Sequence, residues 1–318
     1  MASFDETNKV LSYFLTGLAY LIAIPFFYIV IFKSPPSMRV YKNTILNLAV
    51  WHCITLGCYA ALLQPVYATL PNKSCARFAG LVSYFGREVN IAMVFFTAIC
   101  VENVAAAIII CFFYRYEQLR FTANAVSFME THKGLLTCAS FQLIISLCAA
   151  GLAYAILAMA EIFEHEGAFL FCCPYEKYHF AKVLAVFVGF AFVAQSAVVM
   201  AFVLVIIRRL LSVRTMMTKG TYRLHRLLTI NLITLTALPI TFDVIPFCVF
   251  AYMVYIKADS LYFWVPFVGH TPCGDIILSF VITLYFVTPY RKAIKKILRK
   301  RKVSDVVFVV TTVYNKSL

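Results

Sequence analysis

The chain has 318 residues, of which 63% are hydrophobic and 13% are charged, and its mean hydropathy is +0.86. These values exclude an ordinary water-soluble domain, which is about 45–50% apolar and about 25% charged. The formal charge of +14 does not indicate nucleic-acid binding, because the basic residues lie in short segments between apolar windows rather than on one polar domain.

Seven long apolar windows divide the chain. Windows of about 20 apolar residues match a hydrocarbon layer about 30 Å thick, in which only helices and closed barrels satisfy every backbone polar group. The windows are continuous rather than alternating, so they predict an all-α membrane protein, with a seven-transmembrane helix bundle over residues 1–289. The helices are expected at about 10–32, 44–67, 79–113, 134–159, 181–207, 227–255 and 262–287.

The lysines and arginines predict the orientation of this bundle. Most of the 28 lie in the first, third and fifth connections and after the last window. Because cytoplasmic connections are enriched in these residues, we expect the amino terminus outside the cell and the carboxyl terminus in the cytoplasm. The first window is long enough to serve as a spanning helix rather than a cleaved signal peptide. A multi-pass protein of the plasma membrane is therefore predicted.

Three cysteines and one glycosylation acceptor fall on the predicted outer side. Cys75 precedes the third window, and Cys172 and Cys173 precede the fifth, where oxidation is permitted. A disulfide from Cys75 to Cys172 or Cys173 is predicted, and three free thiols are the alternative, because spacing alone does not fix connectivity. Asn72 begins an Asn-Lys-Ser acceptor for N-glycosylation on the same side.

The segment 290–318 begins with a basic amphipathic pattern. One helical stripe is formed by Tyr290, Ala293, Ile294, Ile297 and Leu298. All the remaining residues from 290 to 302 are lysines or arginines. The pattern predicts a short cytoplasmic helix that lies on the anionic inner leaflet, with membrane lipid as a partner. The alternative is that these cations only fix the topology.

Few charged residues lie inside the windows, namely Arg87, Glu88, Glu102, Asp243 and Asp275. A charge at bilayer depth is costly unless it is paired or hydrated, so each is a candidate functional residue. Arg87 is expected two turns inside the third helix, and Asp243 and Asp275 near the middles of the sixth and seventh. We predict a ligand-binding cavity lined by Arg87, Glu88, Asp243, His270 and Asp275. The alternative is a structural pair such as Arg87 with Asp275.

Four short segments carry a family resemblance. They are SPPSMRVYKN from residue 34, which leads into Leu-Asn-Leu at 46–48; Glu102-Asn103 in the third window; YRLHR at 222–226; and TPYRKA at 288–293. Together with the window spacing, which covers nearly the whole chain, they resemble the nematode serpentine chemoreceptors of the Str superfamily, most closely class H and also classes I and J.

The resemblance implies a GPCR-like receptor of sensory cells that binds a small, odorant-like chemical outside and activates a heterotrimeric G protein inside. In that family a Glu-Asn-Arg triplet occupies the third helix and its arginine contacts the G protein, whereas this chain has Val104 at the last position. The resemblance implies switch residues at the inner face, namely Glu102, Asn103, Pro289, Tyr290 and Arg291. Four basic residues of the fifth connection and its flanks are expected to face the G protein, namely Arg208, Arg209, Arg223 and Arg226. The alternative is that they only fix the orientation of the helices in the membrane.

Other function classes lack the residues that they require. A retinal-binding protein needs a lysine in the seventh window, which has none, and the six histidines are too scattered for a metallohydrolase. No enzyme activity, cofactor or metal is expected. A ligand-gated channel or small-molecule transporter remains the alternative, although the sequence shows neither paired halves nor a polar pore stripe.

Overall fold

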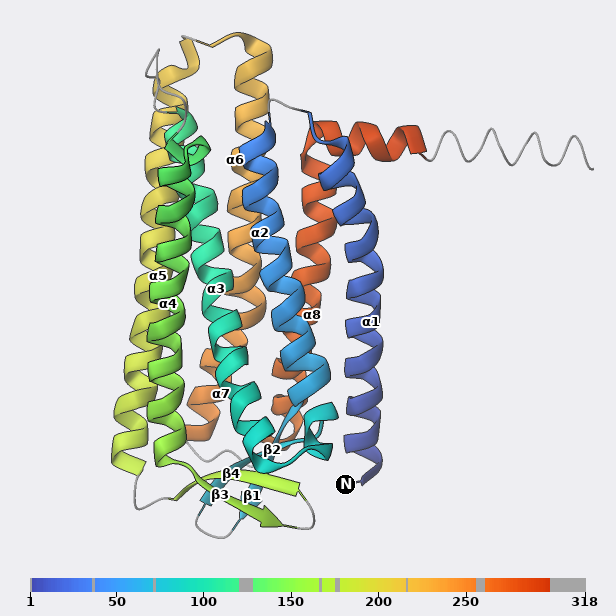
Figure 1. Cartoon of the computed structure of the whole chain (residues 1–318), viewed down its shortest axis with the longest axis vertical. Helices are drawn as coiled ribbons and strands as arrows, with labels where there is room; N and C mark the ends of the chain where they lie inside the picture. The colour runs from blue at the N-terminus through green and yellow to red at the C-terminus, as the bar shows by residue number, and fades with distance from the viewer. Residues whose placement is uncertain are drawn as a thin grey trace, which may run out of the picture.

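The computed structural model describes residues 2–35, 38–70, 73–119, 128–165, 168–174, 178–215, 217–255 and 261–297. Within these ranges seven helices are long and apolar enough to cross a membrane, and they form one bundle (Figure 1). In chain order the bundle contains α1 (Ala2–Lys33), α2 (Arg39–Leu56) with the π-helical η2 (Gly57–Leu63), α3 (Arg87–Leu119), α4 (His132–Met159), α5 (Tyr178–Ser212), α6 (Lys219–Pro239) with the π-helical η7 (Ile240–Val244) and α7 (Ile245–Tyr255), and α8 (Leu261–Phe286). The predicted seven-helix membrane fold is confirmed.

A four-stranded antiparallel sheet covers one end of the bundle, and the sequence analysis did not predict it. Its strands are β1 (Pro65–Leu70), β2 (Lys73–Phe78), β3 (Glu161–His165) and β4 (Ala168–Pro174), in the order β1-β2-β4-β3. The start of α1 lies at this end of the bundle (Figure 1). We call it the sheet end and the opposite end the tail end.

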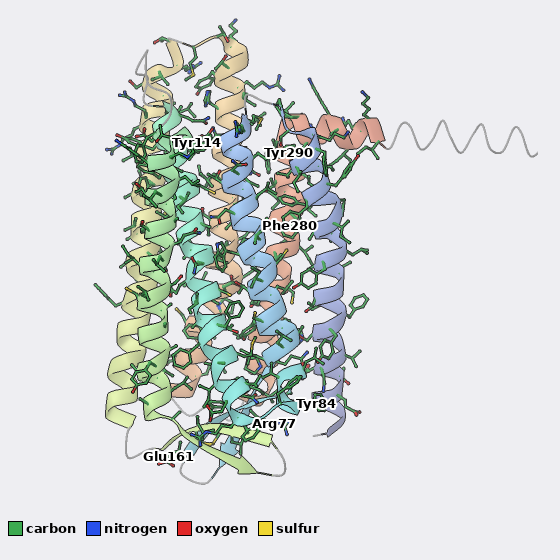
Figure 2. All side chains as sticks on the ribbon, viewed as in Figure 1. Arg77, Tyr84, Tyr114, Glu161, Phe280 and Tyr290 are labelled. Atoms are coloured by element: carbon green, nitrogen blue, oxygen red, sulfur yellow. A yellow bond between two sulfur atoms is a disulfide. The ribbon has the colours of Figure 1, made fainter. Side chains whose placement is uncertain are left out.

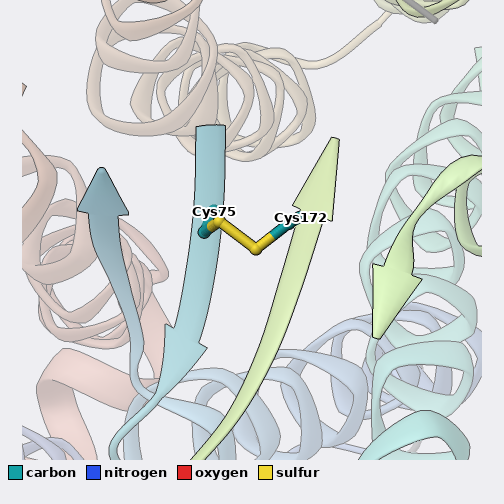
Figure 3. Close-up of a disulfide and its surroundings, with 2 residues drawn as sticks. All are labelled: Cys75 and Cys172. Carbon is teal, nitrogen blue, oxygen red and sulfur yellow. A yellow bond between two sulfur atoms is a disulfide. The ribbon is translucent and has the colours of Figure 1, made fainter. Parts of the chain in front are cut away.

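A disulfide fastens two strands of the sheet. Cys75 of β2 is bonded to Cys172 of β4 (Figure 3). The two residues lie directly opposite each other in the β2–β4 ladder, so the bond joins the segment before α3 to the segment between α4 and α5. Of the two partners that the sequence left open, the structure bonds Cys172, and Cys173 is the next residue of β4. Asn72 lies outside the described residues.

Removing this disulfide is expected to destabilise the fold. The double variant Cys75→Ala/Cys172→Ala should lose about 2–5 kcal/mol of unfolding free energy, because the bond restrains the unfolded chain between residues 97 apart. Thermal melting of the purified protein in detergent measures the loss. The control, Cys173→Ala, should melt like the unmodified chain. Equal melting temperatures for all three proteins would show that the bond adds nothing to stability.

The third helix begins at Arg87, later than the predicted start at 79. The residues before it complete β2 and form the 3₁₀ turn η3 (Leu81–Tyr84). Gly80 lies so close to the end of the second helix that a β-carbon on it would be 2.3 Å from the Leu62 carbonyl oxygen. This contact and the disulfide hold the segment outside α3. The predicted position of Arg87 two turns inside the helix is therefore wrong.

The same helix also ends later than predicted, at Leu119 rather than near residue 113. Arg115, which the sequence analysis placed in a connection, is consequently a residue of α3. Glu102 and Asn103, expected at the inner face, lie near the middle of the helix. Hydropathy located the window, but it could not locate the ends that Gly80 and the packing around Arg115 set.

Large apolar side chains cover the outside of the bundle as well as its interior. On α4, Leu135, Leu136 and Leu147 are all exposed. Inside, Phe26 of α1 stacks on Phe280 of α8 with their ring centroids 4.5 Å apart. An outer surface of this kind is unfavourable in water and is expected where hydrocarbon surrounds the protein.

A short helix follows α8 at the tail end. Residues 288–297 are helical after a bend at Val287, and this helix runs across the direction of the bundle (Figure 1). Tyr290 is buried, and Ala293 and Ile294 pack against the core. The short amphipathic helix after the seventh spanning helix was thus correctly predicted. Residues 298–318 of the predicted tail lie outside the described residues.

Candidate functional site

Two of the predicted ligand residues lie together inside the bundle. Asp243 of η7 and Asp275 of α8 are near enough to interact electrostatically. Asp275 is buried, and its Oδ1 accepts a hydrogen bond from Ser279 Oγ at 3.3 Å. Tyr59 of η2 also lies near Asp243. We call Asp243, Asp275, Ser279 and Tyr59 the carboxyl cluster.

The π-helical turn of the sixth spanning helix positions Asp243. Pro246 has no N–H, so the carbonyl of Phe242 lacks its usual helical donor, and the backbone adopts a π turn there. A β-carbon built on Gly274 would lie 3.5 Å from the Phe242 ring. The turn therefore packs directly against α8 beside Asp275, which brings the two carboxyl groups together.

The carboxyl cluster is suited to a ligand that donates hydrogen bonds or carries positive charge. Nearby carboxylates in a low-dielectric interior repel each other, and a cation or a hydrogen-bond donor stabilises them. Asp243 Oδ1 is buried and has no hydrogen-bond partner among the described residues. An amine or hydroxyl group could supply the missing donor.

The remaining predicted ligand residues do not join this cluster as a set. His270 is half-buried in α8, on the side of Asp275 toward the sheet end. Arg87 and Glu88 are exposed in the first turn of α3. Arg87 thus lies at the surface and Asp275 in the interior, and the five predicted residues do not form one cluster. The alternative pairing of Arg87 with Asp275 is not formed.

Glu102 and Asn103 connect helices in the middle of the bundle. Glu102 accepts a hydrogen bond from Gln195 Nε2 of α5 at 2.7 Å, and the buried Asn103 donates to Ser146 Oγ of α4 at 2.7 Å. At 1.5 Å per residue, Asn103 lies about 24 Å from the tail end of α3. The expected position of these two residues at the inner face is therefore wrong, and in the structure they join α3 to its neighbours.

A second buried cluster, which the sequence analysis missed, contains Arg115 of α3. Arg115 is 1% exposed, and its guanidinium lies over the Tyr41 ring of α2, 5.0 Å from the centroid. Its Nη1 donates to Gln118 Oε1 at 2.6 Å. Neither Nε nor Nη2 has a hydrogen-bond partner among the described residues. Because a guanidinium stays charged, burial with so few partners is energetically costly.

Tyr41 links Arg115 to the sixth helix and to the helix 288–297. Asn231 Nδ2 of α6 donates to Tyr41 Oη at 3.3 Å, and Tyr290 lies near enough to Tyr41 to interact electrostatically. The Tyr290 and Ser34 hydroxyl oxygens are 2.9 Å apart. Burial raises the pKa of Tyr290 above its ordinary value of 10.0, so this phenol is neutral at pH 7. We call Arg115, Tyr41, Asn231, Tyr290 and Ser34 the arginine cluster.

The other predicted inner-face residues lie around the arginine cluster or at the surface. The basic residues Arg208, Arg209, Arg223 and Arg226 are all exposed, and Pro289 and Arg291 are half-buried. Figure 2 shows Tyr114, the neighbour of Arg115, and Tyr290 toward the tail end of the bundle. One sequence signal for Arg115 existed. It stands between Tyr114 and Tyr116 immediately after a long apolar run, where an arginine with aromatic neighbours can be buried.

A comparison with protein families gives this arrangement its context. The family model of the serpentine type 7TM GPCR chemoreceptors Srh matches residues 3–300. The chain belongs to the Srh family. The predicted resemblance to nematode serpentine chemoreceptors is confirmed over nearly the whole length of the chain. Comparison with curated proteins gives no match. Srh proteins form a receptor family rather than an enzyme family, so we interpret the two clusters in this Srh chain as parts of a receptor.

Proposed function

We propose that this Srh chain is a chemosensory receptor of the plasma membrane that binds a small chemical at the carboxyl cluster and activates a heterotrimeric G protein at its tail end. The sheet end faces the outside and the tail end the cytoplasm. Two features support this orientation: the lysines and arginines concentrate in the connections at the tail end, and the disulfide lies at the sheet end, where an oxidising exterior maintains it.

The ligand reaches the carboxyl cluster from the sheet end. Asp243 and Asp275 bind the part of the ligand that donates hydrogen bonds or carries positive charge, and His270 lies on the side from which the ligand comes. The apolar side chains of α1, α6 and α8 surround the rest of a small molecule. A ligand of this kind supplies a cation or hydrogen-bond donor to the two buried carboxyl groups.

The sixth spanning helix carries the signal between the two clusters. It contributes Asp243 to the carboxyl cluster and Asn231 to the arginine cluster, about 18 Å apart along its axis. The π turn at η7 and Pro239 interrupt the regular helix between them. A ligand that prefers one geometry of this turn shifts the balance between two helix arrangements, and Asn231 moves relative to Tyr41 and Arg115.

The observation that carries the proposal is the buried, incompletely hydrogen-bonded guanidinium of Arg115. Its unused donors fit the carbonyl or carboxylate oxygens of a G protein segment that inserts at the tail end after the helices move. Exposed arginines of α5 and α6, among them Arg208 and Arg223, lie on the surface that meets such a partner. Arg115 thus takes the role that the resemblance assigned to the position of Val104.

The proposal predicts a ligand response that requires a G protein. Cells expressing the intact chain are exposed to pools of volatile and soluble chemicals, and calcium or cyclic nucleotide is recorded. An active pool should lose its effect when the guanine-nucleotide cycle is blocked. A variant tests the link between the two clusters in the same cell line. Asn231→Ala breaks the hydrogen bond to Tyr41 and should weaken the response. A ligand-evoked current that persists without G protein would contradict the proposal and indicate a channel.

A further inference from the structure

The buried guanidinium of Arg115 carries a positive charge that no carboxylate balances within the described part of the chain. None of the four side chains that act on it electrostatically is a carboxylate: they are Tyr41, Tyr114, Cys111 and His225. A guanidinium does not lose its proton, and Arg115 is 1% exposed. The closed bundle therefore holds an uncompensated charge in a low-dielectric interior, which is energetically costly.

The acidic residues of the same helix do not reach this charge. Glu117 is only two residues further along α3, but two residues correspond to about 200° of helical rotation, so the two side chains lie on different faces. Glu102, the acid before Arg115 in the helix, is about 20 Å away along the axis. A counter-charge for Arg115 must therefore come from outside this helix.

The unused donors of Arg115 form one edge of its guanidinium. Nη1 donates to Gln118 Oε1 at 2.6 Å, and the Tyr41 ring covers one face of the group. Nε and Nη2 are the two atoms without a hydrogen-bond partner among the described residues, and their N–H groups point in the same direction. A fork of this kind binds an anion through two parallel hydrogen bonds.

His225 of α6 adds another group beside the fork. It lies near enough to Arg115 to interact electrostatically, and its buried Nδ1 has no hydrogen-bond partner among the residues that the structure describes. In the tautomer with a proton on Nδ1, this neutral ring is a further donor. Together α3 and α6 thus contribute three buried nitrogen atoms without partners, Nε and Nη2 of Arg115 and Nδ1 of His225.

We propose that Arg115 and His225 hold a small monovalent anion of the size of chloride between α3 and α6, and that this anion competes with the G protein for Arg115. A water molecule satisfies hydrogen bonds but leaves the charge uncompensated, whereas an anion does both. An anion on the fork occupies the two donors that the proposed function gives to a partner oxygen. Anion binding does not depend on that function, but the competition rests on it.

The first experiment uses chloride as the probe and needs neither an active chemical nor a G protein. The purified full chain in an uncharged detergent is placed in sodium chloride or in sodium gluconate of equal ionic strength, so that screening is the same. Chloride should raise the melting temperature by about 2–4 °C, because it binds only the folded chain. The chloride NMR line should broaden beyond that of protein-free detergent. Equal melting and no excess broadening would overturn the site.

Variants separate the fork from the other cations of the protein. Arg115→Met should lose the effect of chloride on melting and the excess broadening that the fork causes, and His225→Leu should weaken both. The matched control is Arg39→Met, because Arg39 is an exposed arginine at the start of α2, and this variant should keep both effects. The melting curve in gluconate shows that each variant is folded. Full chloride effects in Arg115→Met would place the anion elsewhere and overturn the proposal.

The competition is measured separately, as nucleotide exchange on a purified heterotrimer with the receptor and an active pool from the cell assay. Receptor-driven exchange should fall about threefold when chloride replaces gluconate, after subtraction of the exchange by the heterotrimer alone in each salt. Unchanged exchange with chloride bound would overturn the competition and leave the anion site. No receptor-driven exchange in either salt would contradict the proposed function and with it the competition, while melting and the chloride NMR line still decide the anion site.

Discussion

Replacing Arg115 with methionine is expected to impair G protein activation strongly while leaving the stability of the receptor nearly unchanged. Activation should fall at least about tenfold, because no other side chain of the arginine cluster can offer a guanidinium to the partner. Ligand binding in the absence of G protein should change little, since the carboxyl cluster lies elsewhere in the bundle. Nucleotide exchange on a purified heterotrimer and ligand binding measure the two effects.

Opposing terms explain why the stability should change so little. The variant loses a cation–π contact with Tyr41, about 2 kcal/mol when desolvated, and a charge-assisted hydrogen bond to Gln118, about 1.5–3 kcal/mol. It also removes the cost of a buried charge, which amounts to several kcal/mol. These terms nearly offset each other, so the net change should stay within about 1 kcal/mol.

A conservative variant and a stability measurement distinguish this role from a structural one. Arg115→Lys keeps the charge but lacks the planar fork of donors, so it should retain a small fraction of the activity. If Arg115 only supported the fold, Arg115→Met would lower the unfolding free energy by about 3–5 kcal/mol and would reduce ligand binding together with activation.

Replacing Asp275 with asparagine is expected to weaken the response to an active chemical about 30-fold or more. The change keeps the side-chain shape but removes a buried carboxyl group that the ligand contacts, a loss of at least about 2 kcal/mol. Dose–response curves for the active chemical in cells expressing each variant measure the shift. Surface expression should be unchanged, since Ser279 can still donate to the amide oxygen of residue 275.

Two further variants test whether the carboxyl cluster acts as a unit. Asp243→Asn should cause a similar shift, and the double variant should lose less than the sum of the single losses, because the two groups share one ligand group. Glu88→Gln serves as the control, since Glu88 is an exposed carboxylate of α3. If Glu88→Gln impaired the response as strongly as Asp275→Asn, the ligand would bind near the surface of the sheet end instead.

The sequence predicted the fold well because hydropathy reports burial in lipid directly. Seven continuous apolar windows and the basic connections were sufficient for the bundle, and the spacing of Tyr290, Ala293 and Ile294 was sufficient for the short helix after it. The sheet was not predicted, because its strands are short and their pairing depends on contacts between distant parts of the chain. The start of α3 was misplaced for the same reason, since a disulfide and a close backbone contact at Gly80 set it.

The candidate site was predicted in part. Asp243 and Asp275 were singled out because a carboxylate inside an apolar window has a high cost that does not depend on the tertiary structure, and their role in ligand binding stays a prediction. Arg87 and Glu88 were misplaced together with the start of α3. Arg115 was missed because it follows the apolar window in the sequence, where an arginine is ordinarily a topology signal. Its burial depends on Tyr41 and Asn231, which come from other helices.

A ligand at the carboxyl cluster and a G protein at the tail end should each strengthen the binding of the other. The most direct test measures the affinity of the purified chain in nanodiscs for an active chemical, with and without a nucleotide-free G protein. Thermodynamic linkage predicts at least about fivefold tighter ligand binding with the G protein, reversed by GTP and absent in Arg115→Met. An unchanged ligand affinity with the G protein present would show that the two sites are not coupled.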